Sequence, residues 1–287
     1  MDRYFKRLFL LMAIFGAAHA TADEAPSEGP PLLELGLGVG GVAFPHYRGS
    51  DEYYTLASPL PLVIYRGDII KVSRGGARAE LIDHPRLEIN LSGGGTPPVD
   101  SDDDDNRDGM PDLDATGEFG PTISWLFSDP DDKERLAFKL EVPVRAVVAS
   151  DLSDYEFLDW IVHPQLQLRT RWNTAPRRSF AVTASAGPVF ASNDYHDYFY
   201  SVSPRFATPD RRAYEADAGY GGFEFSAGVF HRRDKWRFGA YSSVDLLDGA
   251  TFDDSPLVAD DTAWVVGLFV ARSLWSSERR AEEELEE

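Results

Sequence analysis

The stretch LAFKLEVPVR, residues 136–145, alternates apolar side chains with charged, small or proline residues. The apolar row consists of Leu136, Phe138, Leu140, Val142 and Val144. Because successive side chains of a β-strand point to opposite faces, this period of two predicts a strand with one unbroken apolar face. A soluble barrel would need a polar outer face, so the stretch favours a strand that faces lipid.

The same alternation recurs along most of the chain and predicts twelve strands. They are expected at about residues 33–44, 54–65, 69–74, 76–82, 86–92, 114–127, 135–149, 159–172, 179–191, 214–230, 235–246 and 262–275. Ordinary strands have about 5 to 6 residues, whereas tilted membrane strands need about 9 to 11. The sequence therefore predicts an all-β fold, a closed antiparallel transmembrane β-barrel of 12 strands, with the count around residues 69–92 left open. A soluble periplasmic barrel is the alternative.

Connection lengths and tryptophans agree with this prediction. Short connections (66–68, 83–85, 128–134, 173–178, 231–234) alternate with the long ones at 93–113, 193–213 and 247–261. Short periplasmic turns and long outside loops are typical of outer-membrane barrels. We expect aromatic girdles at both interfaces, with Trp160 and Trp264 at the outer strand ends and the other four at the periplasmic ends: Trp125, Trp172, Trp236 and Trp275. Six unrelated core tryptophans are the alternative.

The chain ends predict export and a simple domain order. A basic head with Arg3, Lys6 and Arg7 precedes an apolar run over 8–18 and a small-x-small site at 18–20. This is the layout of a secretory signal peptide; an N-terminal anchor is the alternative. We predict a signal peptide at 1–20, a periplasmic lead-in at 21–32, the barrel at 33–275 and a charged tail at 276–287.

Composition narrows the classes of protein. The formal net charge is −20, which argues against a nucleic-acid partner. The chain contains no cysteine, so neither disulfides nor a lipid-modified cysteine can occur. Mean hydropathy is −0.31, and no long apolar segment follows residue 20, so helical membrane spans are not expected.

Four segments in order resemble the MipA/OmpV family of outer-membrane proteins. They are PHYRGSDEYY (45–54), GMPDLDATGEFGP (109–121), DYHDYFYSVSP (194–204) with AYEADAGY (213–220), and LLDGATFDDSPLV (246–258). The resemblance implies an outer-membrane β-barrel in a Gram-negative envelope. From the best-known member it also implies a scaffold that links a lytic transglycosylase to a murein synthase.

An acidic loop offers a candidate calcium site. Asp104, Asn106, Asp108 and Asp112 follow the pattern D-x-N-x-D-G-x-x-D, with Gly109 at the turn. Calcium takes six to eight hard oxygens, which alternating Asp and Asn can supply. The glutamate that closes an EF-hand loop is absent. A solvated acidic loop, bridged to lipopolysaccharide through divalent ions, is the competing interpretation, and no metal site is assigned.

Signals for catalysis are weak. His196 lies beside Asp194 and Asp197 in a long outside loop, a composition compatible with a hydrolase at the barrel rim. A general base also needs a nucleophile or a positioned water, and the sequence shows neither. The loop is more simply an aromatic segment packing on the barrel mouth, and His163 is expected to face the lumen beside Gln165. We therefore expect no enzyme, no catalytic residues and no cofactor.

The predicted lumen face carries charges of both signs. They are Glu88, Glu118, Lys139, Glu141, Arg145, Arg169, Arg171, Glu215, Asp217, Glu224 and Arg237. An unpaired buried charge is costly, so these groups either pair and plug the lumen or line a hydrated channel.

Three functions follow as hypotheses. The first is a non-enzymatic outer-membrane scaffold with periplasmic murein-synthesis and lytic enzymes as partners. The second is a narrow channel for small solutes, and the third an outer-membrane hydrolase. All three place the protein in outer-membrane lipid and lipopolysaccharide.

Overall fold

The computed structural model describes residues 31–66, 70–73, 76–84, 86–128, 136–175 and 178–280. The predicted signal peptide therefore lies outside the described residues. The strands are β1 (Leu33–Pro45), β2 (Tyr53–Arg66), β3 (Ile70–Ser73), β4 (Gly76–Asp83), β5 (Leu87–Gly94), β6 (Ala115–Leu126), β7 (Leu136–Ser150), β8 (Tyr155–Val162), β9 (Gln165–Ala175), β10 (Arg178–Ala191), β11 (Gly219–Arg233), β12 (Trp236–Leu246) and β13 (Thr262–Ser276). An α-helix, α2 (Asn193–Tyr200), and the 3-10 turns η1 (Ser101–Asp103) and η3 (Pro204–Phe206) lie in loops.

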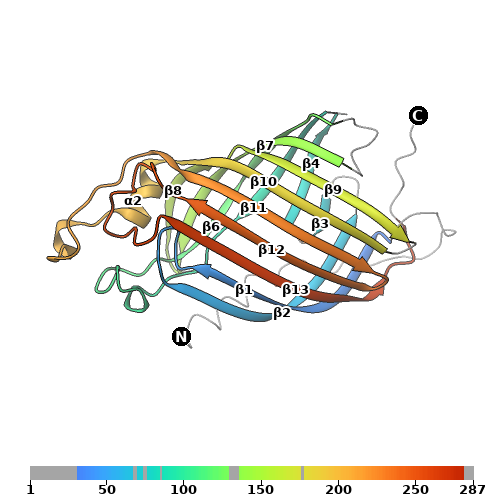
Figure 1. Ribbon diagram of the computed structural model, residues 1–287, viewed down its shortest axis with the longest axis horizontal. Helices are drawn as coiled ribbons and strands as arrows, with labels where there is room; N and C mark the ends of the chain where they lie inside the picture. The colour runs from blue at the N-terminus through green and yellow to red at the C-terminus, as the bar shows by residue number, and fades with distance from the viewer. Residues whose placement is uncertain are drawn as a thin grey trace.

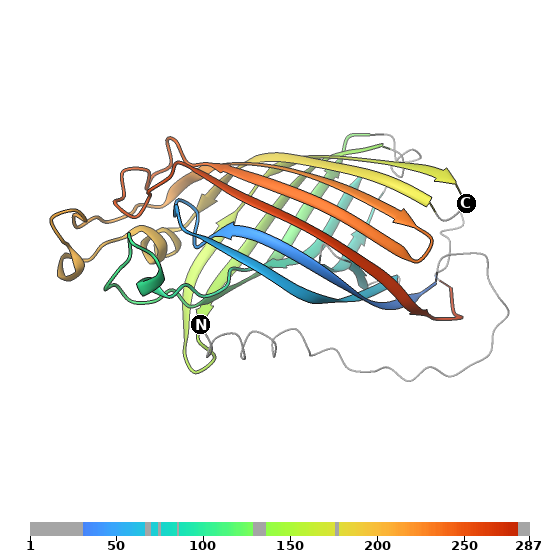
Figure 2. The same cartoon turned by 60° about the horizontal axis from the view of Figure 1, so that its bottom comes forward.

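All the strands belong to one antiparallel, barrel-like sheet of 13 strands (Figure 1). Apart from β8 and β9, strands that are neighbours in the chain pair with one another, and the last strand, β13, pairs with the first, β1, from Ala43↔Val266 to Glu34↔Ser276. Figure 2 shows the strands running obliquely between two ends. One end carries the long loops 46–52, 95–114, 192–218 and 247–261, and is called the long-loop end below. The other carries the hairpin between β11 and β12 and is called the short-turn end.

The predicted strand 159–172 is divided in two. Both β8 and β9 pair with β7 and with β10, so they occupy one position in the sheet one after the other. Pro164 lies between them, and proline has no N–H to contribute to a ladder. The break therefore follows from a residue whose effect the alternation pattern does not show.

The two faces of the sheet have opposite character. Outward positions carry large exposed apolar side chains, including Leu136 (47%), Phe138 (39%) and Leu268 (65%). All six tryptophans are at least 39% exposed, as the girdle interpretation requires. Inward positions bury polar groups such as Glu34, Asn90 and Glu141. This arrangement is the reverse of a water-soluble protein, and it confirms the apolar row of residues 136–144.

The sheet is incomplete between β2 and β5. β2 pairs with β3 only at Tyr65 and Arg66, and the last β4–β5 pair joins Glu80 to Asn90. Within the described residues, 53–64 of β2 and 91–94 of β5 thus have a strand neighbour on one side only; we call this the β2–β5 gap. Pro59 and Pro61 lie along that edge of β2, and prolines within sheets are confined to edges.

The long loop 193–213 differs from its prediction. It contains α2, and β11 begins at Gly219 rather than at residue 214. A β-bulge lies at Gly221 and Gly222, where the β10–β11 register shifts and Gly222 has φ of 99°. Among the described helices, none combines the length and apolarity that a membrane crossing needs.

Candidate functional site: a capped mouth and the cavity beneath it

Helix α2 forms the centre of the long-loop end. Ser192 caps its N-terminus by accepting a hydrogen bond from the N–H of Tyr195 (3.4 Å). Residues 195, 196, 199 and 200 of the helix are buried, because positions three and four apart share one helix face. The helix therefore turns an aromatic face into the mouth of the sheet.

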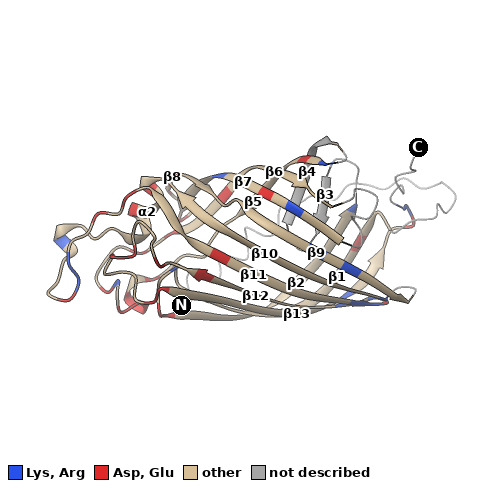
Figure 3. Ribbon diagram, turned by 45° about the horizontal axis from the view of Figure 1, so that its top comes forward, with Lys and Arg blue, Asp and Glu red and all other residues tan. Residues whose placement is uncertain are grey.

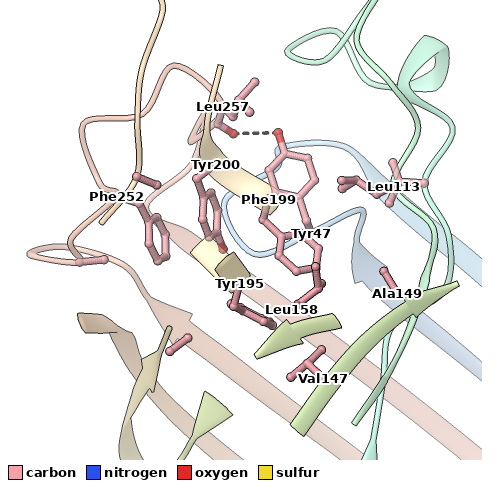
Figure 4. Packing of buried hydrophobic residues seen from close by; sticks show 14 of the residues in the cluster. Tyr47, Leu113, Val147, Ala149, Leu158, Tyr195, Phe199, Tyr200, Phe252 and Leu257 are labelled. Carbon is pink, nitrogen blue, oxygen red and sulfur yellow. Dashed lines mark hydrogen bonds between the residues drawn. The ribbon is translucent and has the colours of Figure 1, made fainter. Parts of the chain in front are cut away.

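Four loops close over this face and form the largest apolar core of the described chain, which we call the cap cluster. Its members are Tyr47, Val99, Leu113, Val147, Ala149, Leu158, Ala191, Tyr195, Phe199, Tyr200, Val202, Ala216, Leu247, Ala250, Phe252 and Leu257. Figure 4 shows most of them converging from α2, from loops and from strand ends. Loops that pack this closely behave as a small domain that covers the mouth.

Tyr200 is the centre of the cap cluster. Its ring stacks on Phe252 with centroids 3.6 Å apart and planes 5° from parallel. Its hydroxyl donates to the carbonyl of Arg48 (2.9 Å), and its own carbonyl accepts from Ser255 Oγ (2.6 Å). Tyr47 similarly donates to the carbonyl of Leu257 (2.8 Å). Burial raises the pKa of both tyrosines, so they remain neutral donors.

The loop 95–114 is fastened by buried polar groups. Asp104 accepts from Ser50 Oγ (2.7 Å) and lies 3.1 Å from His46 Nδ1. Burial alone would raise the pKa of Asp104, but these two hydrogen bonds hold it below its usual value. Arg107 is 3% exposed and donates to Ser101 Oγ and to the carbonyl of Phe199. The loop is thereby tied to α2 and to the β1–β2 loop.

The candidate calcium ligands do not converge. Asp104 faces His46 and Ser50, whereas Asp112 accepts from the N–H of Ser101 (2.9 Å). The amide of Asn106 donates to Asp51, and the backbone carbonyls of 106 and 108 accept from Arg211. Within the described ranges, no three His, Cys, Asp or Glu side chains are placed to share a metal ion. The carboxylate and carbonyl oxygens of this loop instead accept hydrogen bonds that hold the cap together.

His196 is a core residue of the cap. It is 1% exposed, its Nδ1 donates to the carbonyl of Asp217 (2.7 Å), and its ring lies edge-on to Phe252. Asp194 and Asp197 turn away from it into a shallow outer pocket of about 490 Å³, which Glu156 and Glu215 also line. The structure therefore does not bring the three residues 194, 196 and 197 together as a catalytic group.

We expect acid to loosen the cap. Burial lowers the pKa of His196, so below about pH 6.5 the unfolded cap binds a proton that the folded cap does not. Stability is complete above that value and is lost as the pH falls towards the folded pKa. Asp104, whose pKa is also lowered, adds a second loss below about pH 4. Limited proteolysis within 201–218 at a series of pH values would measure both steps.

A His196→Gln variant is the control for this prediction. The protease should cleave this variant at a rate that hardly changes between about pH 6.5 and 5, because the imidazole that titrates first has been removed. A wild-type cap that stays equally protected from pH 7 down to about pH 4 would contradict the prediction.

Several inward charges of the sheet are paired. Glu34 bonds Arg66 and Arg237 (2.8 and 2.6 Å). The other pairs are Lys139–Glu141 (2.6 Å), Arg145–Glu118 (3.1 Å) and Arg48–Asp245 (2.7 Å). Of the two alternatives left open for the predicted lumen charges, pairing holds for Glu118, Lys139, Glu141, Arg145 and Arg237.

Sequence reasoning placed two charges wrongly and missed others. Glu215 and Asp217 are exposed in the loop before β11, because that strand begins later than predicted. The partners Glu34, Arg48, Arg66 and Asp245 were not expected in the lumen. Glu34 and Asp245 alternate with outward apolar residues, and that signal could have identified both.

A cavity of about 240 Å³ lies in the lumen beneath the cap. Its wall consists of Arg48, Gly94, Gly95, Thr96, Glu118, Pro143, Arg145, Ile161, His163, Val189, Tyr195 and Glu224. His163 faces the lumen as predicted, and its Nε2 is buried without a hydrogen-bond partner among the described residues. The cavity combines acids, guanidinium groups, an imidazole and the ring of Tyr195 in a small space.

The apolar outer face, the inward ion pairs and the aromatic strand ends define a membrane protein of the β-sheet class. The family model of "MltA-interacting protein MipA" matches residues 37–274, and the chain belongs to this family. A segment of 89 residues is 34% identical to "Outer membrane protein Omp26La" of Vibrio anguillarum and equally to "Outer membrane protein OmpV" of Vibrio cholerae. The protein is an outer-membrane protein, as its family and relatives are.

These similarities have limited extent. The matched segment covers 30% of this chain and 33% of each curated relative, so about a third of their length is compared. Among solved structures, the NanC porin is 10% identical with a TM-score of 0.35, covering 84% of this chain and 100% of that one. A FadL homologue of Pseudomonas aeruginosa is 8% identical with a TM-score of 0.28, covering 85% and 90%.

Proposed function

We propose that the chain forms a closed 12-stranded barrel, with β8 and β9 counted as one strand. It spans the outer membrane with the long-loop end outside and serves as a scaffold for periplasmic murein-remodelling enzymes. The observation that carries the scaffold proposal is the cap: sixteen buried apolar residues pack into one cluster at the mouth. A barrel that is closed at the mouth is poorly suited to passing solutes and is left with surfaces for binding.

Two further observations support this choice over a channel. Three lumen carboxylates, Glu34, Glu118 and Glu141, are engaged in ion pairs rather than left to line a water-filled path. The family is described by an interaction with MltA, and we extend that partner class to this chain.

Among the described residues, the short-turn end offers a group of exposed cations for such partners. Exposed cations gather there: Arg86, Arg171, Arg178, Arg233, Lys235, Arg272 and Arg279. The long-loop end is acidic by contrast, as Figure 3 shows. A basic rim on the periplasmic side would attract acidic protein surfaces and raise association rates.

The experiment is a pull-down from detergent-solubilised envelopes, with planar-bilayer conductance measured on the same purified protein. We expect murein-remodelling enzymes to co-purify and no conductance steps. An Arg233→Glu, Lys235→Glu variant should lose the partners, whereas Arg205→Glu at the opposite end should keep them. Discrete conductance steps without a reproducible partner would overturn the scaffold and favour the narrow channel.

The transmembrane barrel makes a separate prediction. Leu268 is 65% exposed at the middle of β13, where we place the bilayer midplane. Leu268→Arg should destabilise the folded protein in lipid by about 2–4 kcal/mol, since charge on the lipid face costs most at the midplane. Leu274→Arg, near the strand end, should cost about 0–1 kcal/mol.

Urea unfolding in liposomes, followed by tryptophan fluorescence, measures both variants. If the arginine variants at residues 268 and 274 lose the same free energy of unfolding, the depth of the residue in the lipid does not determine that loss. The bilayer would then not be centred on β13 as proposed.

A further inference from the structure

Two carboxylates lie side by side in the lumen. Glu224 of β11 is paired in register with Asp245 of β12, and like charges directly opposite one another are destabilising. Arg48 neutralises Asp245 through Nε (2.9 Å) and Nη2 (2.7 Å). Glu224, by contrast, makes no hydrogen bond or ion pair with any residue that the structure describes.

The remaining charges of the cavity beneath the cap are satisfied. Arg145 is occupied by Glu118 (3.1 Å) and by Ser92 Oγ (3.1 Å). Each guanidinium group therefore has its own carboxylate, and the charge left over belongs to Glu224. Because an uncompensated buried charge is costly, the cavity favours a ligand that brings a positive charge.

The other walls define the rest of that ligand. Tyr195 presents an aromatic ring at the wall, and rings attract cations. Ile161 and Val189 add apolar surface. Within the described residues no three acidic or histidine side chains can share a metal ion, so an inorganic cation lacks ligands. The volume of about 240 Å³ suits a small organic molecule.

The cavity reaches exposed residues at one side. The cap cluster covers it from above, whereas Gly94 and Gly95 line it and are also exposed. Gly94 is the last residue of β5, on the edge that borders the β2–β5 gap, and Gly95 follows it. Gly95 has φ of 152°, and a Cβ there would lie 2.2 Å from the carbonyl oxygen of Thr116. No side chain can therefore narrow this opening at residue 95.

We propose that this cavity is a binding site for a small organic cation, a primary ammonium on a compact apolar body. The carboxylate of Glu224 accepts a hydrogen bond from the ammonium group. Tyr195 and the apolar wall contact the apolar part of the ligand. The site is independent of the scaffold role, because it lies in the lumen and not on the basic rim.

Benzylamine is the probe and benzyl alcohol its neutral counterpart, both titrated calorimetrically into the purified full-length protein in detergent. We expect saturable binding of the amine alone. Glu224→Gln should weaken it by about tenfold or more, the scale of a lost charge-assisted hydrogen bond. Glu224→Asp keeps the charge and should retain part of the affinity.

The matched control is Glu156→Gln, Glu215→Gln, which removes two acids of the outer pocket and should leave binding unchanged. Loss of binding in this control, or equal affinity in wild type and Glu224→Gln, would overturn the proposal, as would absence of saturable amine binding to wild type. Heat-modifiability on gels confirms that each variant is folded. No partner enzyme is present, so failure here leaves the scaffold proposal untouched, and a failed pull-down leaves this site untouched.

Discussion

Replacing Tyr200 by alanine is expected to open the mouth and give a protein that conducts ions across a planar bilayer, where the wild type is silent. Tyr200 is 2% exposed and stacks on Phe252 at 3.6 Å. Removing a buried aromatic side chain costs about 3–5 kcal/mol. The carbonyl of Arg48 also loses its hydroxyl donor. Because this one cluster holds the cap together, a loss of stability of that size is expected to unfold the cap before the sheet unfolds.

Two measurements test this prediction together. Conductance steps should appear in Tyr200→Ala, and proteolysis should become faster in 201–218 and 247–261. Tyr155→Ala is the matched control, because Tyr155 is 78% exposed and should leave both readouts unchanged. A folded Tyr200→Ala protein whose loops are cleaved but whose bilayers stay silent would show that the lumen itself is plugged below the cap.

The strands were predictable because the pattern that specifies them is local. In residues 136–144 every second side chain meets the outer face, so alternation alone identifies the strand and its lipid side. The same logic placed Glu141 inward, where it is buried. This pattern did not reveal the break at Pro164. Proline removes a backbone N–H donor but leaves the alternation of side chains unchanged.

The cap was not predictable in detail because its contacts join distant segments. Tyr47 and Leu257 are separated by 210 residues, and Ser50 and Asp104 by 54. The aromatic run 195–200 suggested packing at the mouth, which is confirmed. Its helical form was missed, although Ser192 is a good N-cap residue. The acidic loop suggested a calcium site because the spacing of its Asp and Asn residues is visible in the local sequence. The position of the Asp104 carboxylate depends instead on its contacts with the distant His46 and Ser50.

For the lumen charges too, the position of a residue was predictable from the sequence but its partner was not. Their inward position follows from strand parity, but their partners follow from register. Glu34 meets Arg237, 203 residues away, because β1 and β12 flank β13. The unpaired state of Glu224 could be seen only once both of its neighbours were placed.

Removing the carboxylate of Glu34 should have the second large effect. Glu34 is 6% exposed and accepts hydrogen bonds from Arg66 (2.8 Å), Arg237 (2.6 Å) and Ser273 (2.9 Å). Glu34→Ala leaves two guanidinium groups facing each other without an anion. Breaking a buried pair by removing one partner costs about 3–5 kcal/mol, and here one carboxylate serves two cations. The position also lies where β1 meets β13, so the loss acts on the contact between the first and last strands.

Urea unfolding in detergent, followed by tryptophan fluorescence, should show a lower midpoint with an unchanged slope, because stability changes while the surface exposed on unfolding does not. Glu34→Gln keeps the shape and an acceptor, so its midpoint should lie between those of Glu34→Ala and the wild type. Glu278→Ala, an exposed glutamate just beyond β13, is the matched control and should unfold as the wild type does. If Glu34→Ala also unfolds at the wild-type midpoint, water must reach Arg66 and Arg237 from the short-turn end. The lumen would then be hydrated there, and the cap would be the main barrier to a continuous channel.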